Sequence, residues 1–401
     1  MRKLGAGAAA GLAAGAALLA LSSCSLAPHS VARATADPAA ATVPAATAPA
    51  AVAMAGVAAA AAVAGPATVT SPAAAPARAA ATAGTVTITA VGDTMLGSTP
   101  DLPPSPGTYL DAVKSVLDHG IVFGNLEGTL TTVTSGKCGS GSKPHPDCFA
   151  FRDPPSYAGV LKSAGFKVLN DANNHSFDFG AAGQAQTVRS IHAAGLAQTG
   201  LPGEITRVRA GGVAVAFVAF APYPYDADLL GLTAARALIE QARRQAPVVV
   251  VYMHAGAEGA AADHVTGHEE TYLGEDRGNP EAFAHMAIDA GASLVIASGP
   301  HVLRGMQFYR GHLIAYSLGN FAGYSNFSVH GDLTLSGILR VTLTSSGRFE
   351  RARLYPVELS RAGHPSLGGG SVAFVSGLSR TDFGRTAARF SAAGVITPAR
   401  S

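Results

Sequence analysis

The pattern of apolar and polar residues changes abruptly near residue 85. Residues 25–84 are almost entirely Ala, Pro, Val and Thr, with no amphipathic period and with repeated prolines that would interrupt a helix. We expect this stretch to be a flexible tether. From Thr85 onward, Val, Ile, Leu and Phe recur at strand and helix periods. We therefore expect a folded domain over residues 85–360, followed by a C-terminal extension, 361–401, that packs on it only in part.

Within this domain, short runs of β-branched residues, or of apolar and polar residues in turn, are separated by segments whose apolar residues recur at helical spacing. The runs predict strands, and hairpins end the domain; the expected strands are Thr85–Val91, Ile121–Phe123, Lys167–Asn170, Val213–Phe220, Pro247–Tyr252 and Ser293–Ala297, with hairpins over 306–317 and 336–359. Helical spacing fills the intervals, namely 107–120, 154–164, 183–194, 229–245 and 280–290. Strands that alternate with helices and end in hairpins indicate an α/β fold with mixed sheets.

The N-terminus has the organisation of an export signal. A short basic start, Arg2-Lys3, precedes the apolar run Leu4–Leu21, which ends in Leu21-Ser-Ser-Cys24. Leu-Ser-Ser-Cys resembles a bacterial lipobox, so we expect residues 1–24 to be a lipoprotein-type signal peptide with Cys24 as the lipidation site. The protein would then be extracytoplasmic and anchored to the cell membrane as a lipoprotein. The alternatives are an ordinary cleaved signal and a transmembrane helix, for which the run is near the lower length limit.

Cysteine usage agrees with an exported protein. The chain has three cysteines, and lipidation of Cys24 leaves Cys138 and Cys148 as a pair in a loop-like segment. A disulfide is the expected state in an oxidising compartment. The alternative is a metal site with His145 and Asp147, although a separation of ten residues is not a usual zinc spacing.

The balance of charged residues bears on which kinds of partner the protein binds. With 28 Lys and Arg against 26 Asp and Glu, the formal net charge is +2. Such a balance gives no reason to expect a nucleic-acid partner.

Polar side chains follow five of the predicted strands. Ligands of open α/β sheets bind beyond the carboxyl ends of the strands. The residues at these ends are Asp93, Asn125, Glu127, Asn173, Asn174, His175, His254 and His301. Each has an ordinary alternative, such as capping a turn or forming a structural hydrogen bond. Their recurrence at five strand ends favours a shared divalent-metal centre, because carboxylate and imidazole suit Mn, Zn or Fe.

Several short motifs resemble the CapA family of poly-γ-glutamate capsule-synthesis proteins. They are Gly92-Asp93, Asn125-Leu-Glu127, Asn173-Asn-His-Ser-Phe-Asp178, His254-Ala-Gly-Ala-Glu258, Gly299-Pro-His301 and Tyr316-Ser-Leu-Gly-Asn-Phe321. The resemblance covers about Thr85 to Leu359 and implies a metallophosphoesterase-like fold, with two packed mixed β-sheets flanked by helices. It also implies one or two divalent ions (Mn, Zn or Fe) held by Asp93, Glu127, Asn174, His254 and His301, with His175 as the catalytic acid or transition-state stabiliser.

Other residues are expected to support this centre. Asn125, Asn173 and Asn320 would brace the metal ligands from outside. Arg277 and Arg304 are candidates for binding an anionic substrate, since guanidinium suits carboxylate and phosphate, and exposed salt bridges are the alternative. Met95 stands where phosphoesterases have a histidine, and Ala297-Ser298 replaces their Gly-His element. The resemblance therefore implies that one metal site is weakened.

Three functions are compatible with these residues. The resemblance implies a part in capsule or surface-polymer synthesis or export, with an anionic polymer bound at a metal-binding cleft and membrane synthase or exporter subunits as partners. The alternative is an extracellular metal-dependent hydrolase, a phosphoesterase or an amidase. A third is a binding module without catalysis, since a fold does not determine a function.

Overall fold

The computed structural model describes residues 84–139 and 148–399. The predicted signal peptide, its lipidation site Cys24 and the tether up to residue 83 lie outside the described residues. None of the helices in the described ranges is long and apolar enough to cross a membrane. Cys138 and Cys148 form a disulfide, as expected.

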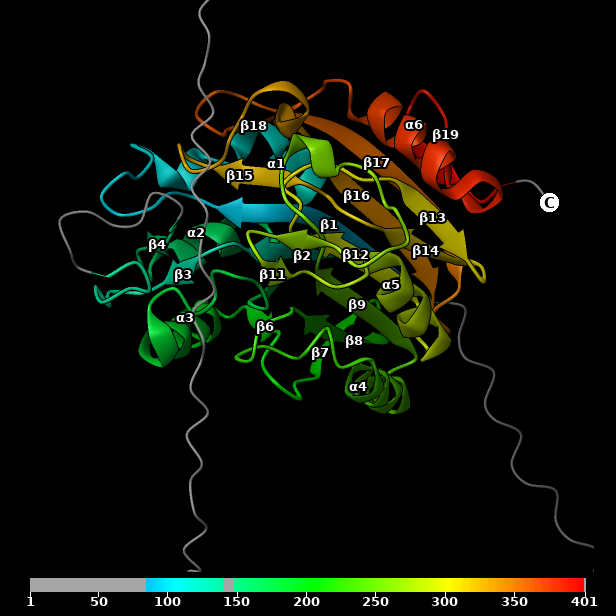
Figure 1. Cartoon of the computed structure of the whole chain (residues 1–401), viewed down its shortest axis with the longest axis horizontal. Coiled ribbons are helices and arrows are strands. Elements are labelled where there is room, and N and C mark those ends of the chain that lie inside the picture. Colours follow the sequence, from blue (N-terminus) through cyan, green and yellow to red (C-terminus); the bar gives the residue numbers. More distant parts are fainter. Residues whose placement is uncertain (1–83, 140–147, 400–401) are drawn as a thin grey trace, which may run out of the picture. The chain divides into compact units, whose positions relative to one another are not determined.

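Two β-sheets form the centre of the domain (Figure 1). The ten-stranded sheet has the order β19-β20-β17-β16-β1-β2-β5-β6, while β15 also pairs with β1 and β18 with β17. Its strands are β1 (Thr85–Met95), β2 (Ile121–Leu126), β5 (Phe166–Asn170), β6 (Ala197–Thr199), β15 (Asn320–Gly323), β16 (Leu335–Thr344), β17 (Phe349–Leu359), β18 (Pro365–Leu367), β19 (Arg389–Phe390) and β20 (Val395–Thr397). Strands β1, β2, β5 and β6 are parallel, and β16 and β17 are antiparallel to their neighbours.

The six-stranded sheet has the order β13-β14-β12-β9-β8-β7. Its strands are β7 (Thr206–Ala210), β8 (Val213–Phe220), β9 (Val248–His254), β12 (Leu294–Ser298), β13 (Met306–Tyr309) and β14 (His312–Ala315). The four central strands are parallel, and the edge strands β7 and β13 are antiparallel. Two short pairs complete the strands: β3 (Thr129–Leu130) with β4 (Arg152–Asp153), and β10 (Thr271–Tyr272) with β11 (Glu275–Asp276).

The valine run of β9 shows how the two sheets pack. Val248, Val250 and Tyr252 point into the core shared with the ten-stranded sheet, and the residues between them face the helices on the other side. A strand places alternate side chains on opposite faces, so a continuous apolar run is buried on both. The same alternation continues to His254, which therefore points between the sheets at the end of the strand.

Helices cover the outer faces of both sheets. The helices are α1 (Asp111–Leu117), α2 (Tyr157–Ala164), α3 (Gly180–Ala193), α4 (Leu232–Gln245), α5 (Pro280–Asp289) and α6 (Ser371–Phe383), with single 3₁₀ turns at 106–108, 260–262, 331–334 and 384–386. Helices α1, α2 and α3 pack on the ten-stranded sheet, and α4 and α5 on the six-stranded sheet (Figure 1). The expected fold, two packed mixed sheets flanked by helices, is confirmed.

The C-terminal segment is more extensively structured than expected. Residues 361–399 add α6, β18, β19 and β20, and β20 pairs with β17 inside the ten-stranded sheet. Val375 of α6 is fully buried in the core between the sheets. The Gly, Ser and Ala content of this segment hides its few apolar residues, which nevertheless close one edge of the domain.

Candidate metal centre

The register of the parallel strands brings three polar side chains into line. Asp93 of β1 pairs with Asn125 of β2, and Asn125 pairs with Asn170 of β5. The Asn125 amide donates to Asp93 Oδ1 at 2.8 Å and also to Glu127, which follows β2 directly. Asn170 and Asn173 both donate to the Asn125 oxygen, at 2.6 and 3.0 Å. Asn125 thus fixes the two carboxylates relative to each other.

The second sheet supplies the opposite wall. His254 ends β9 and pairs in register with Ser298, which ends β12. The Ser298 hydroxyl donates to Asp93 across the gap between the sheets. Tyr252 lies two residues before His254 on the same face, with its hydroxyl 2.5 Å from Ser298 Oγ and 3.3 Å from His254 Nδ1. The ends of the two sheets therefore meet at Asp93.

Two glycines permit this close approach. A Cβ on Gly92 would lie 1.9 Å from the Gly319 carbonyl oxygen, so only glycine fits beside Asp93. Gly299 has a φ of +117°, a conformation that disfavours other residues. A Cβ there would lie 3.2 Å from His254 Nε2 and 3.3 Å from Arg277 Nη2, so Gly299 leaves open the space that both groups face.

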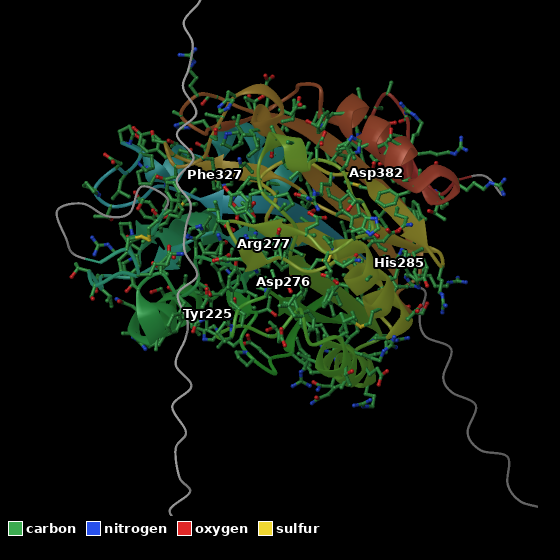
Figure 2. All side chains as sticks on the ribbon, in the orientation of Figure 1. Tyr225, Asp276, Arg277, His285, Phe327 and Asp382 are labelled. Atoms are coloured by element: carbon green, nitrogen blue, oxygen red, sulfur yellow. A yellow bond between two sulfur atoms is a disulfide. The ribbon has the colours of Figure 1, made fainter. Side chains whose placement is uncertain are left out.

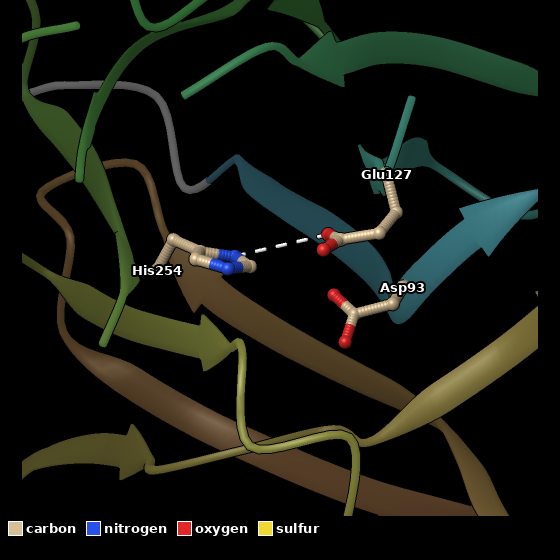
Figure 3. A group of neighbouring side chains, drawn as sticks. All are labelled: Asp93, Glu127 and His254. Atoms are coloured by element: carbon tan, nitrogen blue, oxygen red, sulfur yellow. Dashed lines mark ion pairs between the residues drawn. The ribbon is translucent and has the colours of Figure 1, made fainter. Parts of the chain in front are cut away.

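Asp93, Glu127 and His254 converge on one point, as Figure 3 shows. One ligand atom from each residue lies within 4.8 Å of the others, and all three side chains are buried. The dashed line in Figure 3 joins His254 to Glu127, 3.8 Å apart between Nδ1 and Oε2. These three are among the five metal ligands expected from the resemblance.

The electrostatics of the cluster indicate a missing positive charge. Burial raises the pKa of the Glu127 carboxyl well above its ordinary value, and the nearby Asp93 raises it further. Burial also favours the neutral form of Asp93, but the hydrogen bond and charge of His301 outweigh it and lower the Asp93 pKa. Burial and the Arg277 charge lower the pKa of His254 well below its ordinary value, which keeps the imidazole neutral. Neutral imidazole is the form that binds metals.

The polar atoms of the cluster fit a divalent cation. Buried polar atoms are normally hydrogen-bonded, yet Glu127 Oε1, Asn174 Oδ1 and His254 Nε2 have no hydrogen-bond partner. A fourth atom, Asp93 Oδ2, has only the His301 ring beside it, at 3.2 Å. All four are acceptors when the acids are ionised and the imidazole is neutral. The two carboxylates and the imidazole form a ligand set suited to Mn, Zn or Fe, and Asn174 lines the cleft.

His301 contacts the cluster without belonging to its compact group. Its Nδ1 lies 3.2 Å from Asp93 Oδ2 and 2.9 Å from Asn320 Oδ1, and its Nε2 lies 3.7 Å from Glu258 Oε2. Its backbone φ of +60° is rare for a residue with a side chain and is typical of functional sites. Asn320, expected as an outer brace, holds this ring directly.

His175 lies where a proton donor to a bound ligand would be needed. Its Nδ1 is 2.9 Å from Asp178 Oδ2, and its Nε2 is 4.0 Å from Glu127 Oε1. Asp178 is in turn 2.7 Å from Lys137 Nζ. The carboxylate fixes the orientation of the imidazole, and Nε2 faces the cluster and the cleft above it.

The two arginines expected to bind substrate have different surroundings. Arg277 is buried beside the cluster, where its Nη1 donates to Glu258 at 2.9 Å and to Tyr223 at 3.0 Å. Its Nε and Nη2 have no partner. These free donors agree with a role in binding an anionic group.

Arg304 is also fully buried, but Glu270 accepts two hydrogen bonds from it, at 2.7 and 3.0 Å, and the Ala262 carbonyl accepts another at 2.6 Å. A guanidinium held in this way braces the loop that follows β9. The geometry does not support the expected contact between Arg304 and a substrate.

A cleft of about 690 Å³ opens above the cluster. His175, Asn174, Arg277 and His301 reach it from the metal side, and its walls are largely aromatic: Phe149, Phe151, Tyr223, Tyr225, Tyr272 and Phe327. Tyr225, Arg277 and Phe327 are labelled in Figure 2, and they come from three separate loops. The arrangement is a buried polar centre beneath an accessible cleft.

Sequence reasoning missed four contributors. Ser298, Tyr252 and Asn170 all contact ligands or their braces, and Asp178 orients His175. Each had a local signal: Ser298 ends a strand beside His254, Tyr252 shares the face of His254, Asn170 ends β5, and Asp178 follows His175 by three residues. None has a residue type that indicates a metal site by itself.

Family membership agrees with this site. The family described as "Bacterial capsule synthesis protein PGA_cap" matches residues 87–325, more than half of the chain. The chain belongs to this family. The matched range contains every residue of the cluster and of its hydrogen-bonded supports.

Curated relatives carry related names. A "PGA biosynthesis protein CapA" of Bacillus subtilis is 28% identical over 224 residues, 51% of this chain and 53% of that protein. A "Capsule biosynthesis protein CapA" of Bacillus anthracis is 31% identical over 173 residues, 40% and 41% of the two chains. A probable polyglutamine synthesis accessory protein of Mycobacterium tuberculosis is 26% identical over 273 residues, 59% and 65%. The chain thus matches about half of the length of the first two relatives or less.

Solved structures give a weaker likeness. A putative 5'-nucleotidase from Staphylococcus aureus is 11% identical with a TM-score of 0.37, covering 71% of this chain and 53% of that one. A 5'-nucleotidase precursor from Thermus thermophilus is 12% identical with the same TM-score, covering 70% and 56%. A TM-score of this size has no bearing on activity.

We predict that Asp93→Asn lowers the affinity for Mn²⁺ or Zn²⁺ by more than about 100-fold, since loss of an outer hydrogen-bonding partner already costs about 10–100-fold. Asn125→Ala should fall in that smaller range. Metal titration of the purified chain, with bound metal measured by mass spectrometry, checks both. The control is His192→Gln, at an exposed histidine in α3. Equal metal affinity in Asp93→Asn and in the control would contradict the site.

A second prediction concerns Arg304. Arg304→Met leaves the largely buried Glu270 carboxylate without a cation, with the Ala257 amide as its remaining donor, so the free energy of unfolding should fall by about 3 kcal/mol in urea denaturation. Arg310→Met is the control, because Arg310 pairs with Asp289 at 3.0 Å but is 66% exposed, and its loss should cost less than about 1 kcal/mol. Similar losses in the two variants would show that the Arg304 pair is not a structural brace.

Proposed function

We propose that this protein acts in the synthesis of a poly-glutamate-type surface polymer, and that it does so through a metal-dependent site at Asp93, Glu127 and His254. Homology supports the first part, because relatives named for capsule and polyglutamate synthesis match the domain. The buried, partnerless ligand atoms at the base of an accessible cleft support the second part.

The residues of the site would have distinct tasks. Asp93, Glu127 and His254, with Asn174 from the loop after β5, would hold the ion, and His301 would complete or brace it. A bound divalent ion supplies electrophilic activation of a carbonyl or phosphoryl oxygen, or of a water. The free Nε and Nη2 donors of Arg277 bind an acidic group of the substrate in the cleft.

A hydrolytic step is the second candidate, and the His175–Asp178 pair is the observation that favours it. A histidine whose Nδ1 donates to a carboxylate presents Nε2 for proton transfer. Held at the cleft, Nε2 would give a proton to the leaving group of a phosphoester or an amide. Polymer release or trimming by such a step would also be a part of polymer synthesis.

The location of the protein forms a further part of the proposal. We place the domain outside the cytoplasm, tethered through lipid on Cys24 at the membrane that holds the polymer synthase or exporter. The Leu21-Ser-Ser-Cys24 motif supports this location, and the Cys138–Cys148 disulfide is consistent with an oxidising compartment.

Genetic complementation tests the function. In the bacterium that encodes the protein, deletion should reduce surface polymer, and the His192→Gln variant should restore it. Asp93→Asn and His254→Gln should not, although immunoblots show equal amounts of protein. Full restoration by Asp93→Asn would mean that the cluster is dispensable. Purified metal-loaded chain, offered a generic phosphodiester and a γ-glutamyl amide, tests the hydrolytic candidate, with His175→Gln as the variant expected to lose turnover.

Fractionation tests the location. Cys24→Ser should move the protein from the membrane fraction to the soluble fraction and abolish incorporation of a labelled fatty acid. A lipid anchor would be contradicted if the Cys24→Ser variant stayed in the membrane fraction and the unsubstituted protein incorporated no labelled fatty acid. That result would favour the transmembrane alternative.

A further inference from the structure

A second groove, of about 530 Å³, lies far from the metal cluster. It is formed on the exposed face of β1, β16 and β17, and it is bounded by the loop at His119 and by Val395. Thr85 and Thr87 at the start of β1 line it, whereas Asp93 lies eight residues from Thr85 on the same strand. At about 3.3 Å per residue, the groove is roughly 26 Å from the cluster along β1.

Three arginines converge on this groove. Arg340 of β16 and Arg353 of β17 are directly opposite each other in the antiparallel register, and Arg351 lies two residues from Arg353 on the same face. Like charges directly opposite each other on neighbouring strands are destabilising. No Asp or Glu is among the described residues that line the groove. Outside the lining, Glu350 pairs with Arg351 at 2.8 Å, and both of these side chains are exposed.

Tyr355 holds the opposed arginines in place. The guanidinium of Arg340 lies 4.8 Å from the Tyr355 ring centroid and that of Arg353 lies 4.5 Å from it. Arg340 also donates to the Tyr355 hydroxyl at 2.9 Å and to the Val116 carbonyl, and Arg353 Nε donates to the Ala393 carbonyl at 2.9 Å. Arg340 Nε is buried without a partner. These contacts orient the guanidinium groups but do not neutralise them.

The metal cleft differs in its charge. Its cationic side chains already face carboxylates: Lys137 faces Asp178, Arg277 faces Glu258, and His301 faces Asp93 and Glu258. Glu275 adds a further carboxylate to the lining. Apart from a bound ion, the cleft therefore has no surplus positive charge for a chain of many acidic groups. The three-arginine groove has that surplus.

We propose that the groove lined by Arg340, Arg351 and Arg353 binds an extended polyanion with a carboxylate on each repeat, at a site separate from the metal cluster. Arg351 and Arg353 recur about 7 Å apart along one face of β17, which suits repeated acidic groups better than a single ion. Guanidinium binds carboxylate in a bidentate manner. The identification of the polymer as poly-glutamate rests on the proposed function. The inference of a polyanion site rests on the positions of the arginines alone. The groove would hold the polymer while one segment reaches the metal cleft.

The test measures binding of poly-γ-glutamate to the full chain by calorimetry at low and high salt. Arg353→Gln and Arg351→Gln should each weaken binding about 10-fold, as expected for a charge-assisted hydrogen bond, and high salt should weaken binding by the unsubstituted chain. Arg340→Gln also removes structural contacts, so the two exposed positions carry the test and thermal melting verifies their folding. Arg244→Gln, at an exposed position of α4, is the charge-matched control.

Further measurements distinguish a polycarboxylate from other anionic ligands, and the groove from the metal cluster. Asp93→Asn should lose metal but keep polymer binding, so failure of the metal site and failure of the groove are distinguishable. Absence of polymer binding, or binding that is unchanged in Arg351→Gln and Arg353→Gln, would overturn the proposal. Equally tight binding of inorganic phosphate, or of phosphatidylglycerol vesicles, through the same arginines would also overturn it, because the groove would then not be selective for a polycarboxylate.

Discussion

The structure depends on the burial of two carboxylates where its two sheets meet. Asp93 and Glu127 are fully buried, and both are bound by the one amide of Asn125. Buried negative charge is costly unless it is paired. His301 pairs with Asp93 at 3.2 Å, whereas His254, the histidine nearest to Glu127, is held neutral. Burial and the Asp93 charge disfavour the ionised form of Glu127, and a divalent cation between the two carboxylates would offset both effects. The strand register, the glycine contacts and the asparagine network all maintain this space.

The same constraint explains which structural elements supply the residues around the carboxylates. The residues that fix the carboxylates from the strand ends are short and hydrogen-bonded, such as Ser298 and Asn125. The histidines that reach the cleft, such as His175 and His301, come from loops. Strand ends fix positions well, while loops admit a substrate and adapt to it. The protein thus separates the holding of an ion from the recognition of its ligand. The arginine groove at the other end of β1 would add a third task, which is to hold the rest of the polymer away from the metal cleft.

Much of this organisation was predictable because strand ends have a simple signal. Apolar runs that stop at polar residues indicated Asp93, Glu127 and His254 as neighbours, because each follows or ends a parallel strand at its carboxyl end. That the three come from two facing sheets emerged only from the structure. The pairing of Arg304 with Glu270 was not predictable, because it depends on the path of the loop after β9. The strands β18–β20 were missed because their segments are short and poor in large apolar residues. The opposed arginines were invisible until the register of β16 and β17 was known, since they are 13 residues apart in sequence.

The most direct test of the central claim is a crystal structure of the domain grown with Mn²⁺, with diffraction recorded at the manganese absorption edge. The account predicts an anomalous peak in contact with the carboxylates of Asp93 and Glu127 and with the imidazole of His254. A structure that shows these three side chains ordered around water, with the anomalous signal elsewhere or absent, would contradict it.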